Sequence, residues 1–157
     1  MILYHGSNKT IEKPNIQYSR ATVDFGKGFY LTPLYEQAQK WCAKFKRKGQ
    51  DSVISAYEFD DNAFKKFKTH KFEGYTVEWI EFIASCRKGN DTSDFDIIMG
   101  GVANDKVFNT IELYFEELID IDETIKRLKY EKPNYQVAIR NQQVIGECLK
   151  FERSDIL

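Results

Sequence analysis

The chain has 157 residues and a mass of 18.4 kDa, which is typical of one domain whose hydrophobic core needs no metal or disulfide. Its hydrophobic content of 42% excludes a disordered chain. Its net charge of −1 excludes a general attraction to nucleic acid or to an acidic membrane. We therefore expect a single domain over residues 1–157.

The predicted elements mix strands and helices irregularly along the chain. Apolar runs predict strands at 2–5, 29–31, 52–59, 95–99, 136–140 and near 151. Helical periodicity predicts helices at 33–48, 76–88, from the turn at 104–106 to about 119, at 121–130 before Pro133, and at 141–149. Residues 8–22 are typical of a surface loop, and 63–75 fit no single type. This order differs from regular βαβ units and indicates an α+β fold.

Three predicted elements carry specific expectations. In the helix after Thr32-Pro33, threonine is expected to cap the first turn and proline to occupy the first helical position. Its apolar residues follow one face: Leu34, Ala38, Trp41, Cys42 and Phe45. The strand at 52–59 is apolar on both sides and should be central in a sheet. The helix at 76–88 should bury Trp79, Ile80, Ile83 and Cys86.

Cysteine usage and hydropathy indicate a compartment. The three cysteines lie far apart among apolar neighbours, and no pair has metal-ligand or redox-motif spacing: Cys42, Cys86 and Cys148. They are typical of small buried hydrophobic residues in a reducing cytosol. Because the chain shows neither a leader-like segment nor an apolar run of about 18 residues, we expect a cytoplasmic protein without a membrane partner.

Two short motifs carry the functional signal. The first is Tyr4-His5-Gly6-Ser7, which contains one of the two histidines, and the second is Phe25-Gly26-Lys27-Gly28-Phe29-Tyr30. Glycine lets a backbone approach a ligand or another strand closely, because no Cβ stands in the way. We expect both motifs to close on one small molecule. Structural roles stay open: His5 as a strand-end histidine, Tyr30 and Trp41 as core residues, and Ser7 as a structural hydroxyl.

With these motifs the sequence resembles the ADP-ribosyltransferases of the poly(ADP-ribose) polymerase and diphtheria-toxin type. Over nearly its whole length it is also similar to the bacterial DUF3990 proteins. The resemblance implies an ADP-ribosyltransferase-like fold, with two small packed β-sheets flanked by helices. It also implies NAD as co-substrate, bound in a cleft between His5 and Tyr30.

The resemblance assigns roles residue by residue. It implies that His5 contacts the nicotinamide-side ribose and that Gly6 grips the carboxamide through its backbone. Tyr30 would stack on one face of the nicotinamide ring, and Trp41 on the other face. Three further residues belong to the expected NAD-binding set: Ser7, Lys27 and Gly28.

The third motif departs from the pattern. The resemblance implies a catalytic glutamate at the start of a later strand, and the matching residue is Gln136. Glutamine keeps a hydrogen bond but loses the negative charge beside the developing cation. We therefore expect mono-ADP-ribosylation rather than polymer synthesis, with His5, Tyr30 and Gln136 as the catalytic residues. The alternative is a catalytically weak or inactive NAD-binding module. An increase in nicotinamide release by Gln136→Glu would favour the enzyme.

The acceptor is open at this point between a protein and a nucleic acid. Lysine runs at 44–48 and 65–71 favour a nucleic-acid partner, although such runs are usually solvated helix faces. The polar pair Asn104-Asp105 after Gly100-Gly101 is either a turn or a place where an acceptor is met. The family resemblance further implies a toxin-like role with an antitoxin-like partner.

Overall fold

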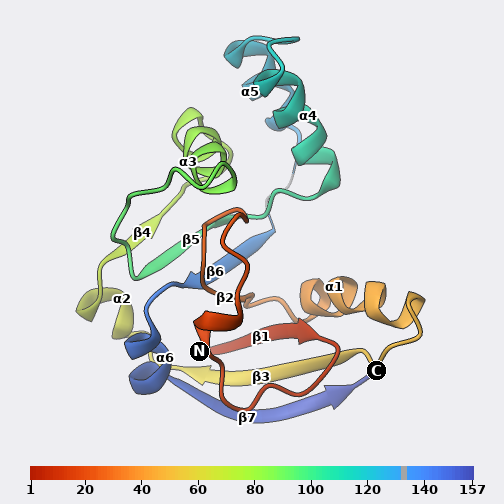
Figure 1. Ribbon diagram of the computed structural model, residues 1–157, viewed down its shortest axis with the longest axis vertical. Helices are drawn as coiled ribbons and strands as arrows, with labels where there is room; N and C mark the ends of the chain where they lie inside the picture. The colour runs from red at the N-terminus through yellow and green to blue at the C-terminus, as the bar shows by residue number, and fades with distance from the viewer. Residues whose placement is uncertain (132–133) are drawn as a thin grey trace.

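The computed structural model describes residues 1–131 and 134–157 and has an α+β architecture built on two small sheets (Figure 1). The expected end of a helix at Pro133 lies outside the described residues. The strands are β1 (Ile2–Ser7), β2 (Phe29–Leu31), β3 (Val53–Phe59), β4 (Thr69–Lys71), β5 (Ile97–Gly101), β6 (Tyr135–Ile139) and β7 (Leu149–Ile156). The helices are η1 (Ile16–Tyr18), α1 (Tyr35–Arg47), α2 (Ala63–Lys66), α3 (Val77–Arg87), α4 (Asp105–Phe115), α5 (Ile121–Leu128) and α6 (Gln142–Cys148).

The first sheet has the order β1-β3-β7 and is antiparallel throughout. The second sheet has the order β2-β6-β5-β4, in which only β4 and β5 run parallel. A single antiparallel bridge between Tyr4 and Thr32 joins the two sheets at the edges formed by β1 and β2. The central position of β3 agrees with its apolar residues on both faces.

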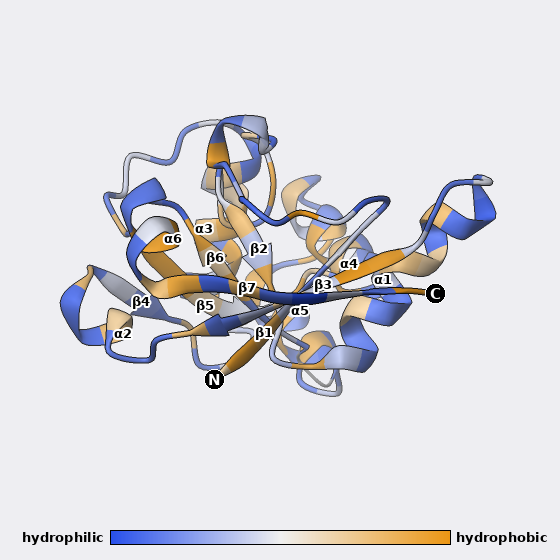
Figure 2. Cartoon of the chain, turned by 90° about the horizontal axis from the view of Figure 1, so that it is seen from below, coloured by the Kyte–Doolittle hydropathy of each residue, from blue (hydrophilic) through white to orange (hydrophobic). Residues whose placement is uncertain are grey.

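Two main clusters of buried side chains form the core. One contains Leu3, Phe29, Leu31 and Tyr57, and therefore joins β1, β2 and β3. The other packs α3 and α4 on the second sheet through residues such as Trp79, Ile98 and Ile111. Figure 2 shows hydrophobic residues on the inner strands and hydrophilic residues on the outer loops.

Helices cover the sheets unequally. Helix α1 packs on the first sheet through Ala38 and Cys42, which contact Ile54 of β3. Helix α3 lies beside the second sheet and buries Trp79, Ile80, Ile83 and Cys86, as the sequence predicts. Helices α4 and α5 project beyond α3, away from the first sheet (Figure 1).

Several expected boundaries are wrong by about two residues. Helix α1 begins at Tyr35 rather than Pro33, and Thr32 Oγ1 instead accepts a hydrogen bond of 3.1 Å from the Leu34 N–H. Strand β5 includes Gly100-Gly101, which the sequence suggests as a loop. Both glycines fit there because aromatic rings occupy the space of a side chain: a Cβ on Gly101 would lie 2.5 Å from the Tyr75 ring.

The predicted apolar face of α1 is also partly wrong. Ala38 and Cys42 are buried, but Leu34 is 47% and Trp41 49% exposed. The sheet beneath α1 is narrow, so it covers only the central line of the helix. All three cysteines are buried and free, as predicted. Among the described residues, no helix is long and apolar enough to cross a membrane.

Candidate functional site

The two motifs meet where β1 and β2 separate. Tyr4 and Thr32 exchange both main-chain hydrogen bonds, at 2.8 and 2.9 Å. In an antiparallel pair the next such exchange would join Gly6 to Tyr30. Instead, His5 Nδ1 lies 2.7 Å from the Tyr30 carbonyl oxygen. The imidazole therefore takes the acceptor that would continue the ladder, and the two strands part after a single bridge.

This separation leaves the Gly6 main chain open. Met1 exchanges hydrogen bonds with Phe59 of β3, so the odd-numbered residues of β1 face β3 and the even-numbered ones face the other edge. Tyr4 uses that edge for Thr32, and Gly6 points the same way. Within the described residues, nothing pairs with the N–H or C=O of Gly6, although the residue is buried. Buried main-chain groups need a partner, so this edge is suited to a ligand that offers one acceptor and one donor.

The hydrogen bond to Tyr30 also fixes the chemistry of His5. A carbonyl oxygen only accepts, so Nδ1 carries the proton and, in the neutral ring, Nε2 is left as an acceptor. Burial lowers the pKa of His5, which outweighs the opposing effect of the bond to Tyr30, and the charge of Lys44 lowers it further. The ring stacks on Phe29 at a centroid distance of 4.4 Å. His5 thus presents a fixed, neutral acceptor at neutral pH.

We expect this lowered pKa to make stability pH-dependent. Because the folded-state pKa lies below the ordinary value of 6.5, the free energy of unfolding should fall as pH drops from about 6.5 towards the folded pKa. Chemical denaturation across this range should show the loss, and His5→Gln should reduce it. NMR titration of the His5 ring should give a midpoint below 6.5, and a midpoint above 6.5 would contradict the assignment.

Gly6 and Trp41 lie side by side on the face of β1 that α1 covers. A Cβ on Gly6 would lie 2.7 Å from Cys42 Sγ, 2.8 Å from the Ala38 carbonyl oxygen and 3.2 Å from Trp41 Cδ1. The glycine therefore also serves packing, because any side chain would push α1 off the sheet. The half-exposed Trp41 ring stands next to the open Gly6 edge.

Positive charge gathers at the same place. Lys44 Nζ lies 3.3 Å from the centre of the Trp41 ring, so a cation already occupies one face of that indole. Burial lowers the pKa of Lys44, and the positive charges of Arg20 and Lys48 lower it further, so each of these two cations lies close enough to repel Lys44. Like charges held together without a counter-charge are typical of an anion site.

Tyr30 shares the site through its main chain, but its side chain turns away from His5. Phe29 and Leu31 belong to the first core cluster, whereas the Tyr30 ring packs against the second. Its hydroxyl donates to the Gly26 carbonyl at 2.6 Å and accepts from the Phe25 N–H at 2.9 Å. Burial raises its pKa far above the ordinary value. The phenol thus fastens the glycine loop, and the residue as a whole is half-buried.

Gln136 lies at the start of β6 beside a charge that the sequence analysis did not single out. Its Nε2 is 3.4 Å from Asp24 Oδ2 and 3.3 Å from the Gly101 carbonyl oxygen. The other oxygen of Asp24 pairs with Arg87, and Oδ2 also accepts from the Ala103 N–H at 3.1 Å. Because both of these neighbours are acceptors, the Gln136 amide must point its NH2 group towards them and its oxygen away. Its Oε1 accepts no hydrogen bond from the described residues and is available to a ligand.

The remaining expected binding residues have clear local roles. Ser7 is buried at the end of β1. Gly28 donates to Ser19 Oγ at 2.9 Å, and a Cβ there would lie 2.8 Å from the Ile139 carbonyl oxygen, so close strand packing requires glycine. Lys27 is exposed on the loop directly before Gly28. Asn104, expected in a turn or acceptor loop, caps α4 by accepting from the Val107 N–H.

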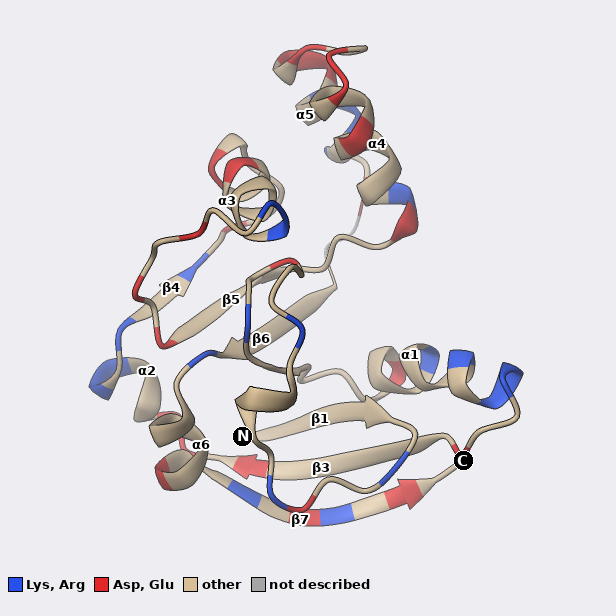
Figure 3. Ribbon diagram, viewed as in Figure 1, with Lys and Arg blue, Asp and Glu red and all other residues tan. Residues whose placement is uncertain are grey.

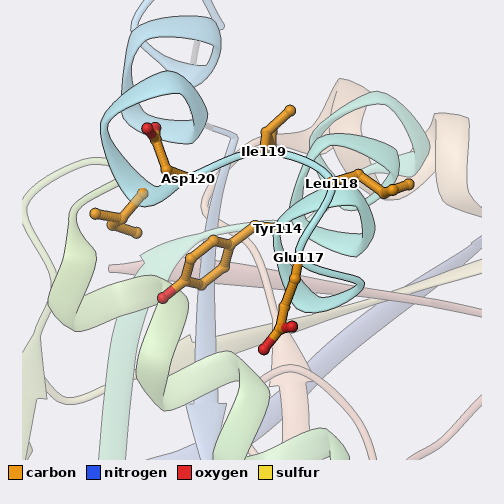
Figure 4. A pocket seen from close by; sticks show the side chains of 6 residues that line it. Tyr114, Glu117, Leu118, Ile119 and Asp120 are labelled. Carbon is orange, nitrogen blue, oxygen red and sulfur yellow. The ribbon is translucent and has the colours of Figure 1, made fainter.

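Two shallow hollows lie elsewhere. One of about 380 Å³ lies at the turn between α4 and α5, where Tyr114, Glu117 and Leu118 line it (Figure 4). Another of about 210 Å³ lies between α3 and α4, beside Arg87 and Phe108. Neither is lined by residues of the two motifs.

The sequence patterns do not identify the residues that surround the two motifs. Three charged residues approach the site from different segments: Arg20 from a loop, Lys44 from α1 and Asp24 from just before the glycine motif. A weak signal was present for Asp24, because a charged residue directly before an apolar glycine loop needs a buried partner. For Arg20 no signal distinguishes it from any exposed arginine.

Comparison with known proteins agrees with the sequence resemblance at the level of the family. The sequence matches the family described as "Protein of unknown function (DUF3990)" over residues 1–151, and the chain therefore belongs to that family. No curated protein matches the sequence.

Proposed function

We propose that the chain has an ADP-ribosyltransferase-like fold, binds NAD where β1 and β2 separate, and transfers one ADP-ribose group to a macromolecular acceptor. The observation that carries the proposal is that the N–H and C=O of Gly6 have no partner within residues 1–131 and 134–157 and lie near the His5 imidazole and the Trp41 ring. A carboxamide offers one acceptor and one donor, which is the complement of that edge.

The surroundings of Gly6 support the binding of the other parts of NAD. The Trp41 face that holds the Lys44 ammonium would suit another cation, such as a flat pyridinium ring, once Lys44 turns from the indole to a bound phosphate. His5 Nε2 is suited to accept from a ribose hydroxyl. Arg20 would hold the diphosphate, and the two negative charges would relieve the repulsion between Arg20 and Lys44.

The chemistry of the transfer requires charge stabilisation more than a nucleophile. Breaking the bond between nicotinamide and ribose develops positive charge on the sugar, as in glycoside cleavage. The Gln136 Oε1 can accept from a ribose hydroxyl, and Asp24, bonded to the same amide, polarises it. The neutral amide supports single transfer at a modest rate rather than chain elongation.

A second function is favoured by one observation. The carboxylate closest to Gln136 is that of Asp24, whose oxygens are engaged by Arg87, Ala103 and Gln136 itself. Such a carboxylate stabilises the fold but offers little charge to a reacting sugar. An NAD-binding module with faded catalysis would carry the same site.

Incubation with NAD labelled in the adenosine half, in the presence of cell extract, tests the proposed function. We expect free nicotinamide to appear and label to move into macromolecules. His5→Ala should abolish both, because it removes the ribose contact and lets the strands close. Tight NAD binding without nicotinamide release would favour the binding module, and intact NAD without binding would contradict both functions.

A further inference from the structure

Two lysine runs that look alike in the sequence differ in their acidic neighbours in the structure. In the run at 65–71, three lysines have acidic partners: Lys66 pairs with Glu147, Lys68 with Asp94 and Lys71 with Glu73. These ion pairs neutralise that surface. Only Lys65 has no ion pair within the described residues, so this run retains little excess charge to offer a polyanion.

The run on α1 has no such compensation. Between Lys40 and Lys48 there are five basic residues and no acidic one, and no ion pair joins any of them to the described residues. Figure 3 shows basic residues along this helix and several acidic ones on α4 and α5. From Glu112 to Glu123 six acidic residues occur without a lysine or arginine. The small net charge therefore results from positive and negative segments that lie apart in the chain.

Helix geometry turns the α1 run into a row. Positions 40, 44, 47 and 48 share one side of α1, opposite the buried Ala38 and Cys42. We call these four cations the α1 row: Lys40, Lys44, Arg47 and Lys48. Like charges one turn apart destabilise a helix by about 0.2–0.5 kcal/mol per pair, a cost that a bound polyanion would offset.

We propose that the α1 row binds the phosphate backbone of a single-stranded nucleic acid, which is the acceptor class of the transferase. The acceptor role rests on the proposed function, whereas the binding itself does not. A repeating phosphate chain matches a row of cations spaced by single helical turns. Trp41 lies at the edge of the row beside Gly6, so a strand bound there runs next to the proposed reaction centre. Exposed aromatic rings beside cations are typical of single-strand sites.

Fluorescence anisotropy with a short labelled oligothymidylate, titrated without NAD at several salt concentrations, tests this proposal. We expect affinity to fall with salt, with a log–log slope of about −0.7 for each phosphate neutralised. Lys40→Gln with Arg47→Gln should weaken binding about tenfold and flatten the slope by about 0.7 for each residue. Both side chains are solvent-facing and lie outside the proposed NAD contacts, so NAD affinity should not change.

The matched control is Lys66→Gln with Lys68→Gln, which removes the same charge from the paired run and should leave oligonucleotide affinity unchanged. Equal weakening by both double variants would overturn the proposal, because it would show an unspecific charge effect. Displacement by polyglutamate as effective as by the oligonucleotide would identify an acidic protein partner instead. Tighter binding of a duplex would overturn the single-strand assignment. A chain that binds oligothymidylate but not NAD would refute the proposed function and leave this site standing.

Discussion

Replacing Asp24 with alanine should lower the free energy of unfolding by about 3 kcal/mol, which is a large effect for one loop residue and follows from the burial of its carboxylate. The carboxylate joins three parts of the chain that are distant in sequence: Arg87 at the end of α3, Ala103 after β5 and Gln136 of β6. Its removal leaves a partly buried guanidinium and a main-chain N–H without their acceptor. The estimate is at the lower end of the range for buried pairs because Arg87 retains 28% exposure.

Urea denaturation of the Asp24→Ala variant measures this loss. The matched control is Asp94→Ala, since Asp94 also pairs with a cation, Lys68, but 77% of its side chain is exposed. The control should unfold at nearly the wild-type midpoint. If both variants unfold at the same urea concentration, Asp24 does not hold the glycine loop to the second sheet.

The second large effect concerns activity at position 136. The single change Gln136→Glu should not raise nicotinamide release, because it places a carboxylate against Asp24 Oδ2 and the Gly101 carbonyl, which are both acceptors. The double change Asp24→Asn with Gln136→Glu restores a donor–acceptor pair between positions 24 and 136 and moves the negative charge to position 136, with the loss of the Ala103 N–H contact. We expect the double variant to release nicotinamide about tenfold faster than the wild type, since a charge-assisted hydrogen bond adds roughly 1–1.5 kcal/mol.

Single-turnover nicotinamide release separates the possibilities, with Asp24→Asn alone as the control that removes charge without moving it. A single Gln136→Glu variant as fast as the double one would show that Asp24 does not oppose a charge there. A double variant that folds and binds NAD but is no faster than the wild type would place position 136 away from the reacting ribose.

Much of the fold could be predicted from the sequence because local patterns determine it. Helix α3 begins at the Thr76 cap and buries the expected face, and β3 is central as its two apolar faces require. The errors come from contacts distant in sequence. Gly100 fits inside β5 because the rings of Phe25 and Phe72 lie where a side chain would be. Trp41 is half-exposed because the sheet ends beneath it.

The same limit applies to the candidate site. The sequence motifs indicate His5, Gly6 and Tyr30 as candidate site residues. The structure adds that a hydrogen bond from the His5 ring to the main-chain carbonyl of Tyr30 separates β1 from β2. That bond is not visible in the sequence, since any polar side chain at the end of a strand would look equivalent. Nor do the lysine runs reveal that Glu147 and Asp94 neutralise only one of them.

Amide hydrogen exchange at Gly6, followed by NMR with and without NAD, tests the account most directly. In the free protein we predict rapid exchange of the Gly6 N–H, because the edge of β1 beyond the Tyr4–Thr32 bridge has no partner among the described residues. Saturation with NAD, or with nicotinamide alone, should protect this amide strongly and shift the Trp41 indole resonance. An amide that is already protected without ligand, or that exchanges as fast at saturating NAD as in its absence, would contradict the account.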